Sequence, residues 1–201
     1  FGKIGIFSFN GNKIITSGGG GALISGDAAL IEKSKYLSTQ AREDLPYYQH
    51  LDIGYNYRMT NMAAAVGLAQ LERLEEMVTQ RQAVNERYKE LMASLPGITF
   101  QENNSSSESK FWLTAILIDE EITGFSNDRL RVLLLKNDIE TRFLWKPLHL
   151  QPIYSQAPFY GGKISQRLFS KGLCLPSSTS LTYEDQEEIV GLIEKEFKKV
   201  L

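Results

Sequence analysis

Two short apolar runs near the start of the chain are separated by a polar, glycine-rich stretch. The runs are residues 4–7 and residues 22–25, and between them lie a small polar turn, Lys13, two β-branched residues and four consecutive glycines at 18–21. Apolar and β-branched runs bounded by such turn signals are typical of strands. The pattern therefore predicts a strand, a tight turn with a lysine at its exit, and a return strand.

Helical periodicity follows in two places. Asp27 is a good N-cap for a helix over residues 27–38, which has apolar residues at helical spacing. Residues 63–95 give the longest helical signal, with apolar residues three and four positions apart and charged residues on the other face. Pro96 and Gly97 would end this long helix.

After residue 96 the chain alternates short apolar runs with short amphipathic stretches. Strands are expected at 98–101, 111–118, 139–144 and 173–175, and helices at 127–136, 165–171 and from Thr182 onward. This order predicts a small α/β sandwich. We therefore expect two parts: residues 1–95, which end with the long helix, and residues 96–201, which form the small domain.

Composition narrows the class of protein. The chain has 201 residues, of which 42% are hydrophobic, and a formal net charge of −2, which argues against a nucleic-acid-binding surface. No window of the length that a membrane helix needs is free of charges, so no membrane partner is expected. One cysteine cannot form an internal disulfide, which favours a reducing cytoplasm, and no metal-site spacing of histidines and cysteine exists.

Lys13 is the first candidate for chemistry. A nucleophilic lysine must be held in one direction among groups that favour its neutral form, whereas a surface lysine needs no such frame. Neighbouring glycines let a backbone close on a flat ligand, and the hydroxyl of Ser8 with nearby amides could grip a phosphate. A carbonyl cofactor bound covalently to the lysine would fit this arrangement. The alternative is a solvated lysine beside a glycine-rich turn.

The sequence Gly-x-x-Ser-Phe-Asn-x-Asn-Lys-x-Ile-x-x-x-Gly-Gly-Gly at residues 5–21 resembles the cofactor-lysine segment of the DegT/DnrJ/StrS family, the pyridoxal-phosphate-dependent aminotransferases of nucleotide-linked keto sugars. The resemblance implies that Lys13 holds pyridoxal 5'-phosphate and is the catalytic residue, and that Ser8 and Asn10 help to bind this cofactor. Many members have His where Asn10 stands and Glu where Gly19 stands. The version in this chain resembles the branch that aminates the 4-keto position of UDP-linked sugars.

A second family stretch, Gly-Tyr-Asn-Tyr-Arg-Met-Thr, occupies residues 54–60. Thr60 or Asn61 can cap the helix that follows, so this segment lies just before the positive end of a helix, a place suited to anions. The resemblance implies that Asn56 reaches into the neighbouring subunit's site and contacts the cofactor phosphate, with Arg58 close by. The alternative for Arg58 is a pair with a nearby carboxylate.

Two further stretches extend the resemblance along the chain. Trp-Lys-Pro-Leu-His-Leu-Gln-Pro at residues 145–152 is dense in rings and hydrogen-bonding groups, and the family implies that Trp145 and His149 contact the substrate. The alternative for His149 is a hydrogen-bonded structural histidine. The last stretch is Gly172–Ser177, in which Cys174 lies between leucines with no basic neighbour and is expected to be a buried apolar residue.

The resemblance covers nearly the whole chain and implies its fold class and function. The fold is α/β: the C-terminal part of a fold-type I pyridoxal-phosphate aminotransferase, with the end of the large domain, a long linking helix and a small α/β sandwich. The implied reaction moves an amino group from an amino acid such as glutamate to a nucleotide-linked keto sugar, expected to be a UDP-4-keto-6-deoxy sugar, for surface polysaccharide or glycan biosynthesis. The implied assembly is a cytoplasmic homodimer with sites shared across the interface.

Two alternatives accompany this interpretation. A related dehydratase has histidine in place of the lysine, so Lys13 argues against it. Members of the family have roughly twice this length, and their N-terminal half supplies the ring that stacks on the cofactor and the acid that pairs with its pyridine nitrogen. We therefore expect a C-terminal fragment, and a non-catalytic sugar-nucleotide-binding or dimerisation fragment stays open as the alternative.

Overall fold

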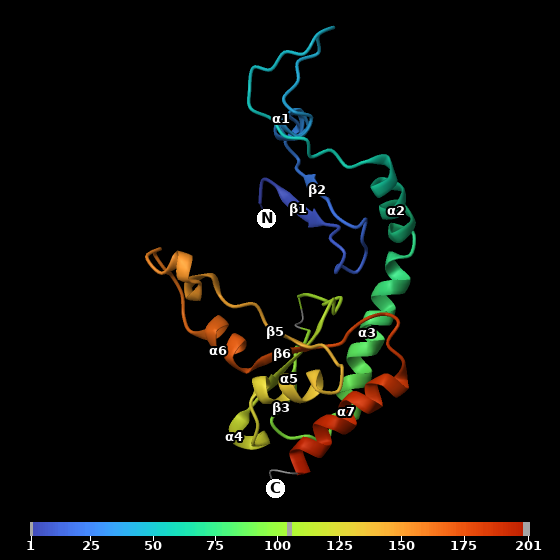
Figure 1. The fold of residues 1–201 in the computed structure, drawn as a ribbon, viewed down its shortest axis with the longest axis vertical. Coiled ribbons are helices and arrows are strands. Elements are labelled where there is room, and N and C mark those ends of the chain that lie inside the picture. Colours follow the sequence, from blue (N-terminus) through green and yellow to red (C-terminus); the bar gives the residue numbers. More distant parts are fainter. Residues whose placement is uncertain (1, 104–105, 199–201) are drawn as a thin grey trace. The chain divides into compact units, whose positions relative to one another are not determined.

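A computed structural model describes residues 2–103 and 106–198. The chain divides into two compact units, Phe1–Met77 and Val78–Leu201, and this division lies within helix α3 (Leu74–Leu91) (Figure 1). The sequence predicts a division later, after residue 95. The difference arises because the buried side chains of α3 belong to the core of the second unit.

The first unit begins with an antiparallel hairpin. Strands β1 (Gly5–Ser8) and β2 (Gly21–Ile24) pair with each other, which confirms the predicted strand and return strand. Helix α1 (Ala28–Ser38) follows, and the Asp27 carboxylate accepts the N–H of Ala29 at 3.0 Å, as expected of its N-cap.

The predicted helix over residues 63–95 is interrupted. It forms α2 (Asn61–Leu71), whose first turn is capped by the Thr60 hydroxyl, and then α3. Between them the Arg73 N–H donates to the carbonyl of Gln70, three residues back, so one turn has 3₁₀ geometry. The two residues at the break are glutamate and arginine, which are good helix formers, so the sequence gives no sign of it.

The second unit contains a four-stranded antiparallel sheet of order β3-β4-β6-β5. The strand that was expected to start at Phe111 starts only at Thr114, because Phe111 has a φ of 43° and so leaves the extended conformation. The strand expected over 139–144 is limited to two residues. The strands are β3 (Ile98–Phe100), β4 (Thr114–Ile118), β5 (Arg142–Phe143) and β6 (Gly172–Leu175).

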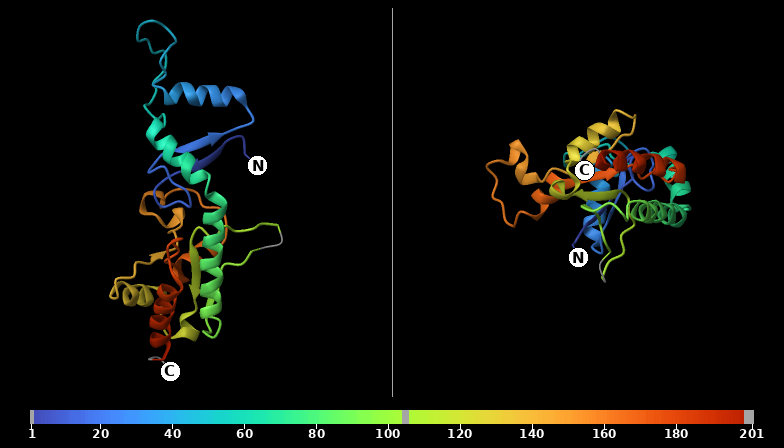
Figure 2. Two further views of the ribbon diagram at one scale, coloured as in Figure 1. Left: turned by 90° about the vertical axis from the view of Figure 1, so that its right-hand side faces the viewer. Right: turned by 90° about the horizontal axis from the view of Figure 1, so that it is seen from below.

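Helices α3, α5 and α7 gather around this sheet and bury its core (Figures 1 and 2). The remaining elements of the unit include a short helix α4 and two 3₁₀ turns between β5 and α6. Their bounds are α4 (Glu120–Thr123), α5 (Asn127–Leu135), the 3₁₀ turns Leu148–Leu150 and Pro152–Tyr154, α6 (Ile164–Lys171) and α7 (Tyr183–Lys198). The predicted helices and the α/β class are confirmed.

Within the described ranges, none of the helices combines the length and the apolar character that crossing a membrane requires.

Candidate active site

The loop between β1 and β2 is closed at its base by hydrogen bonds around Phe9. The Phe9 N–H donates to the Gly20 carbonyl at 3.0 Å, and the Phe9 carbonyl accepts the Ser17 N–H at 3.1 Å and the Thr16 hydroxyl at 3.0 Å. These bonds hold residues 10–16 as a closed loop at the end of the hairpin.

Lys13 lies at the end of a tight turn in this loop. Its N–H donates to the Asn10 carbonyl at 3.0 Å, which is the bond of a four-residue β-turn. The Asn10 N–H donates to the Ser8 hydroxyl oxygen at 3.3 Å. Lys13 is half-buried, in contrast to the exposed lysine of the alternative interpretation. The structure thus brings Ser8, Asn10 and Lys13 into one local turn.

Three of the four consecutive glycines are required by the backbone. Gly18 and Gly20 have φ angles of 80° and 79°, which side chains with a Cβ rarely adopt. A Cβ on Gly21 would lie 2.3 Å from the Phe7 carbonyl oxygen, so the pairing at the end of the hairpin needs glycine. Gly19 has neither constraint, since it has open space around it and no positive φ.

Helix α2 supports this loop from one side. The Gln70 side-chain oxygen accepts the Thr16 N–H at 3.4 Å, and a Cβ on Gly67 would meet the Ser17 Cβ at 3.4 Å. Sequence reasoning missed Gln70, because a single glutamine on an apolar helix belongs to no motif.

Asn56 and Arg58 are carried by an extended segment that is bound to the C-terminal end of α1. The N–H groups of Tyr55 and Tyr57 donate to α1 carbonyls at 2.7 and 3.0 Å, and the two tyrosine rings stack with centroids 5.1 Å apart. The backbone on both sides of Asn56 is therefore fixed to a helix end.

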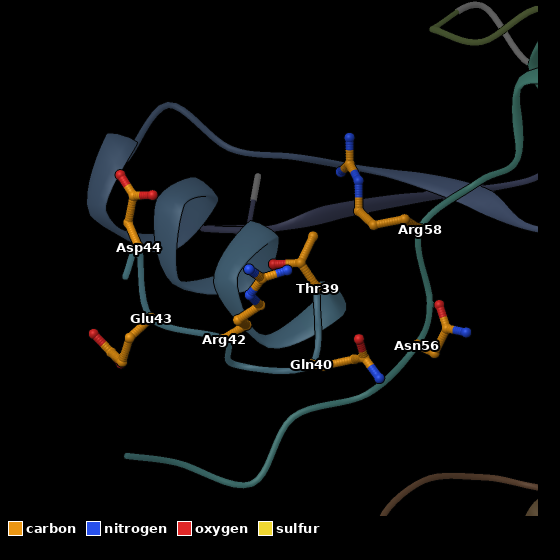
Figure 3. Close-up of a pocket in the computed structure, with 7 residues that line it drawn as sticks. All are labelled: Thr39, Gln40, Arg42, Glu43, Asp44, Asn56 and Arg58. Atoms are coloured by element: carbon orange, nitrogen blue, oxygen red, sulfur yellow. The ribbon is translucent and has the colours of Figure 1, made fainter. Parts of the chain in front are cut away.

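A cavity of about 410 Å³ lies where this segment faces the end of α1 and the loop that follows. Figure 3 shows Asn56 and Arg58 on the extended segment, while the other lining residues come from the helix end and the loop. Two arginines and two carboxylates line the cavity, so it is polar and has no large excess of positive or negative charge. The lining residues are Thr39, Gln40, Arg42, Glu43, Asp44, Asn56 and Arg58.

A second cavity, of about 730 Å³, lies among the β1–β2 hairpin, α1 and the segment that holds Arg58. Ser8 and Arg58 both line it, so two of the residues predicted to bind the cofactor lie at the same cavity within a single chain. Lys13 and Asn10 line neither of these two cavities, and Asn56 lines the first. Among the described residues, the ion pairs do not include Arg58, which argues against its pairing with a carboxylate.

Trp145 and His149 lie in the second unit, on the segment that leaves β5. The Trp145 side chain is exposed and its ring lies 5.7 Å from that of Trp112. The His149 ring stacks on Phe159 with centroids 3.9 Å apart and an interplanar angle of 28°. Among the residues that the structure describes, this ring stack is the contact found for the His149 side chain, and the structural hydrogen bond of the alternative is not seen. Sequence reasoning missed Trp112 and Phe159, because only the folded chain brings them to the motif.

Neither cysteine nor metal chemistry is indicated by the described part of the chain. Cys174 is buried in β6, and this burial raises the pKa of its thiol. Among the residues described, there is no group of three or more His, Cys, Asp or Glu side chains that could hold a metal ion.

Comparison with known proteins gives a consistent result along the chain. Residues 1–194 match the DegT/DnrJ/EryC1/StrS aminotransferase family. EpsN of Bacillus subtilis (strain 168), which is named as a pyridoxal phosphate-dependent aminotransferase, is 44% identical over 197 residues, covering 96% of this chain and 50% of EpsN. A GDP-perosamine synthase of Vibrio cholerae is 37% identical, over 98% of this chain and 53% of its own length.

A solved structure shows the same fold. DesI, determined in the presence of its TDP-sugar product, superposes with a TM-score of 0.86 at 26% identity, covering 98% of this chain and 50% of DesI. The chain spans about half the length of the curated relatives that it matches. These likenesses confirm the predicted fold class, that of part of a fold-type I aminotransferase.

Proposed function

This chain belongs to the DegT/DnrJ/EryC1/StrS aminotransferase family, and we propose that it is the lysine-bearing part of an enzyme that transfers an amino group from an amino acid, glutamate, to a nucleotide-linked keto sugar. The cofactor is pyridoxal 5'-phosphate, the group in the name of EpsN. The observation that carries the proposal is the half-buried Lys13 at the exit of a closed turn.

The residues of the first unit fit this cofactor. Lys13 is an amine whose backbone is fixed, which suits an aldehyde carbon, and the Ser8 hydroxyl, which is held in the same turn, suits a phosphate. Lys13, Ser8 and Asn10 would hold the cofactor from one subunit of a homodimer. Asn56 and Arg58 would bind the phosphate of the cofactor in the neighbouring subunit. When bound, the cofactor supplies an electron sink for the carbon that loses its proton.

Lys13 then has two duties that require the same amine in the same place. It would hold the cofactor, and its free Nζ would take the proton from the Cα of the amino donor. In the second half of the reaction Lys13 moves a proton in the opposite sense, to the sugar carbon that receives the nitrogen. The closed turn supports both duties, because it fixes the position from which the side chain extends.

The substrate is proposed from the relatives and from the second unit. The names of the V. cholerae synthase and of DesI contain a GDP-sugar and a TDP-sugar, and these support a nucleotide-linked sugar without favouring UDP. The resemblance of the Ser-Phe-Asn-Gly-Asn-Lys sequence to the branch that acts on UDP-linked 4-keto sugars favours a UDP-linked 4-keto-6-deoxy sugar. Trp145 and His149 would contact it. Comparing rates on UDP-, GDP- and dTDP-linked 4-keto sugars tests this choice.

We also propose a biological setting. The spore coat polysaccharide biosynthesis protein SpsC of Bacillus subtilis is 26% identical over 93% of this chain, which supports a role in surface polysaccharide or glycan biosynthesis. A single cysteine and no possible internal disulfide favour a reducing cytoplasm as the place of work.

The role of Lys13 is tested by trapping the cofactor on it. Reduction of the whole enzyme with borohydride should attach the cofactor mass to the peptide that contains Lys13, and Lys13→Ala should lose both this mass and all measurable turnover. Lys3→Ala removes an exposed lysine of the same unit and should keep both. Trapping on another lysine, or turnover by Lys13→Ala, would refute the role of Lys13. No trapped cofactor and no turnover in the wild type would leave the non-catalytic binding or dimerisation fragment as the better interpretation.

A further inference from the structure

The two tryptophans of the chain form a pair at the surface of the second unit. Trp112 and Trp145 are the only tryptophans in the sequence, and their rings lie 5.7 Å apart with an interplanar angle of 35°. Trp145 is 65% exposed, whereas Trp112 is half-buried beneath it. A large ring that is backed by a second ring and open to solvent on its other side is suited to stacking against a flat ligand.

An arginine holds the backbone of the supporting ring. The Arg81 guanidinium, from α3, donates to the Trp112 carbonyl at 2.9 Å and also to the Ser177 carbonyl just after β6. Among the residues described, no carboxylate forms an ion pair with Arg81. Its charge is therefore directed at two backbone oxygens, and its partial burial lowers its pKa. A partly buried cation used in this way fixes two chain segments in place.

The backbone beside Trp112 is also strained. Phe111 is buried and has a φ of 43°, which is uncommon for a bulky residue and costs free energy. The Ser177 hydroxyl accepts the Thr114 N–H at 2.8 Å and donates to the Leu175 carbonyl at 2.7 Å, so β4 and the end of β6 are locked together next to this strained residue.

We propose that Trp112 and Trp145 form one stacking platform for the nucleobase of the sugar nucleotide, and that Arg81 is the residue that positions this platform. The identity of the ligand rests on the proposed function. Any nucleobase can stack on an aromatic side chain, because every base has a flat π-face. Such a platform therefore fits a nucleotide-linked substrate. Trp112 lies outside the family stretch that contains Trp145, and Arg81 acts on the platform through the backbone of Trp112.

Fluorescence of this chain tests the platform without any need for activity, since all of its tryptophan emission comes from the pair. Titration with UDP, GDP and dTDP should quench the emission, whereas a free hexose should not. In Trp145→Phe the quenching should be lost, and in Arg81→Met the midpoint should rise at least tenfold. Arg73→Met, which removes an exposed arginine paired with Glu76, should leave the midpoint unchanged. No quenching by any of the three diphosphates would overturn the proposal.

Kinetics of the whole enzyme separate positioning from general damage. Trp112→Leu and Arg81→Met should raise the KM for the sugar nucleotide at least tenfold, while the half-reaction with the amino donor stays within twofold. Arg81→Lys, which keeps the positive charge on a side chain of different shape, should give an intermediate KM. Equal loss in both half-reactions would overturn the positioning role. A wild-type enzyme that aminates no sugar would instead refute the proposed function, and the fluorescence titration would still decide the platform.

Discussion

Asp185 shows how a single side chain fixes the start of a helix. Its carboxylate accepts the Thr182 N–H at 2.9 Å, and the Thr182 hydroxyl accepts the Asp185 N–H at 3.1 Å, which is a reciprocal cap on α7. The hydrogen bonds from the Thr182 backbone and side chain lower the pKa of Asp185. A carboxyl group of lowered pKa stabilises the fold above its unfolded-state pKa, about 3.9. That contribution is lost as the pH falls through the lower folded-state value.

We therefore expect the stability difference between the wild-type chain and Asp185→Asn to depend on pH. At pH 7 the wild type should have the larger free energy of unfolding, and the difference should shrink as the pH falls from 4 toward 2. Thr182→Ala, which removes the other half of the cap, should cost about 1 kcal/mol at pH 7. Urea unfolding at several pH values measures both effects. A difference between wild type and Asp185→Asn that stayed constant from pH 7 to pH 2 would contradict this account.

Some of the predicted site residues have partners that are close in the chain. Ser8, Asn10 and Lys13 come together because one β-turn contains them, so a local motif is enough to identify them. Trp112 and Phe159 contact Trp145 and His149 only through the fold of the second unit, so no spacing in the sequence reveals them. The burial of Cys174 was also predictable from local sequence, because its neighbours in the strand are leucines.

At the scale of elements, the crossing of residues 54–57 over the end of α1 depends on one glycine. A Cβ on Gly54 would lie 2.2 Å from the backbone nitrogen of Ala41, which is closer than any real Cβ contact. Ala41 is itself fully buried and has a φ of 48°. The chain at this crossing therefore has no room to move aside, and the position of Asn56 depends on it.

Gly54→Ala should loosen this crossing. The amides of Gln40, Tyr55 and Tyr57, which bond across it, should exchange with solvent at least tenfold faster than in the wild type, as NMR hydrogen exchange would measure. Gly26→Ala is the matched control, because a Cβ at Gly26 has nothing within 4 Å and its φ is not positive. Unchanged exchange in Gly54→Ala would show that the crossing can adapt.

Elements were predictable where the local pattern decides them. The hairpin, α1 and α7 have turn or capping signals in the sequence, and each forms where expected. The break between α2 and α3 and the late start of β4 have no such signal. In the first case good helix formers continue through the break, and in the second Phe111 is held in an unfavourable conformation by its tertiary surroundings.

At the scale of the whole molecule, the two units differ in how much core they contain. Among the described residues of the first unit, Ala41 is the one buried hydrophobic side chain, while Ile6 and Phe7 of β1 are 71% and 55% exposed. The second unit buries side chains from α3, β4, α5, β6 and α7 in one cluster. Because apolar burial is the main source of stability, the second unit should be the more stable one in this chain.

Hydrogen exchange followed by mass spectrometry would measure this difference. Peptides that cover β1 and β2 should exchange at least a hundredfold faster than peptides that cover β4 and β6, because the hairpin amides are not shielded by a core. Equal protection of both sheets in the isolated chain would show that the first unit is stabilised by something other than buried apolar side chains.

The boundary inside α3 also determines how the second unit could be produced as a separate recombinant domain. A truncation that began at Val78 would delete the first turn of the helix, with Glu75 and Glu76, whose negative charges favour a helix N-terminus. The remaining stretch would have to begin a new helix while Val84 and Tyr88 still fill the core. A recombinant domain that begins at Glu72 or earlier would keep that first turn, so the N-terminal end of α3 would stay helical.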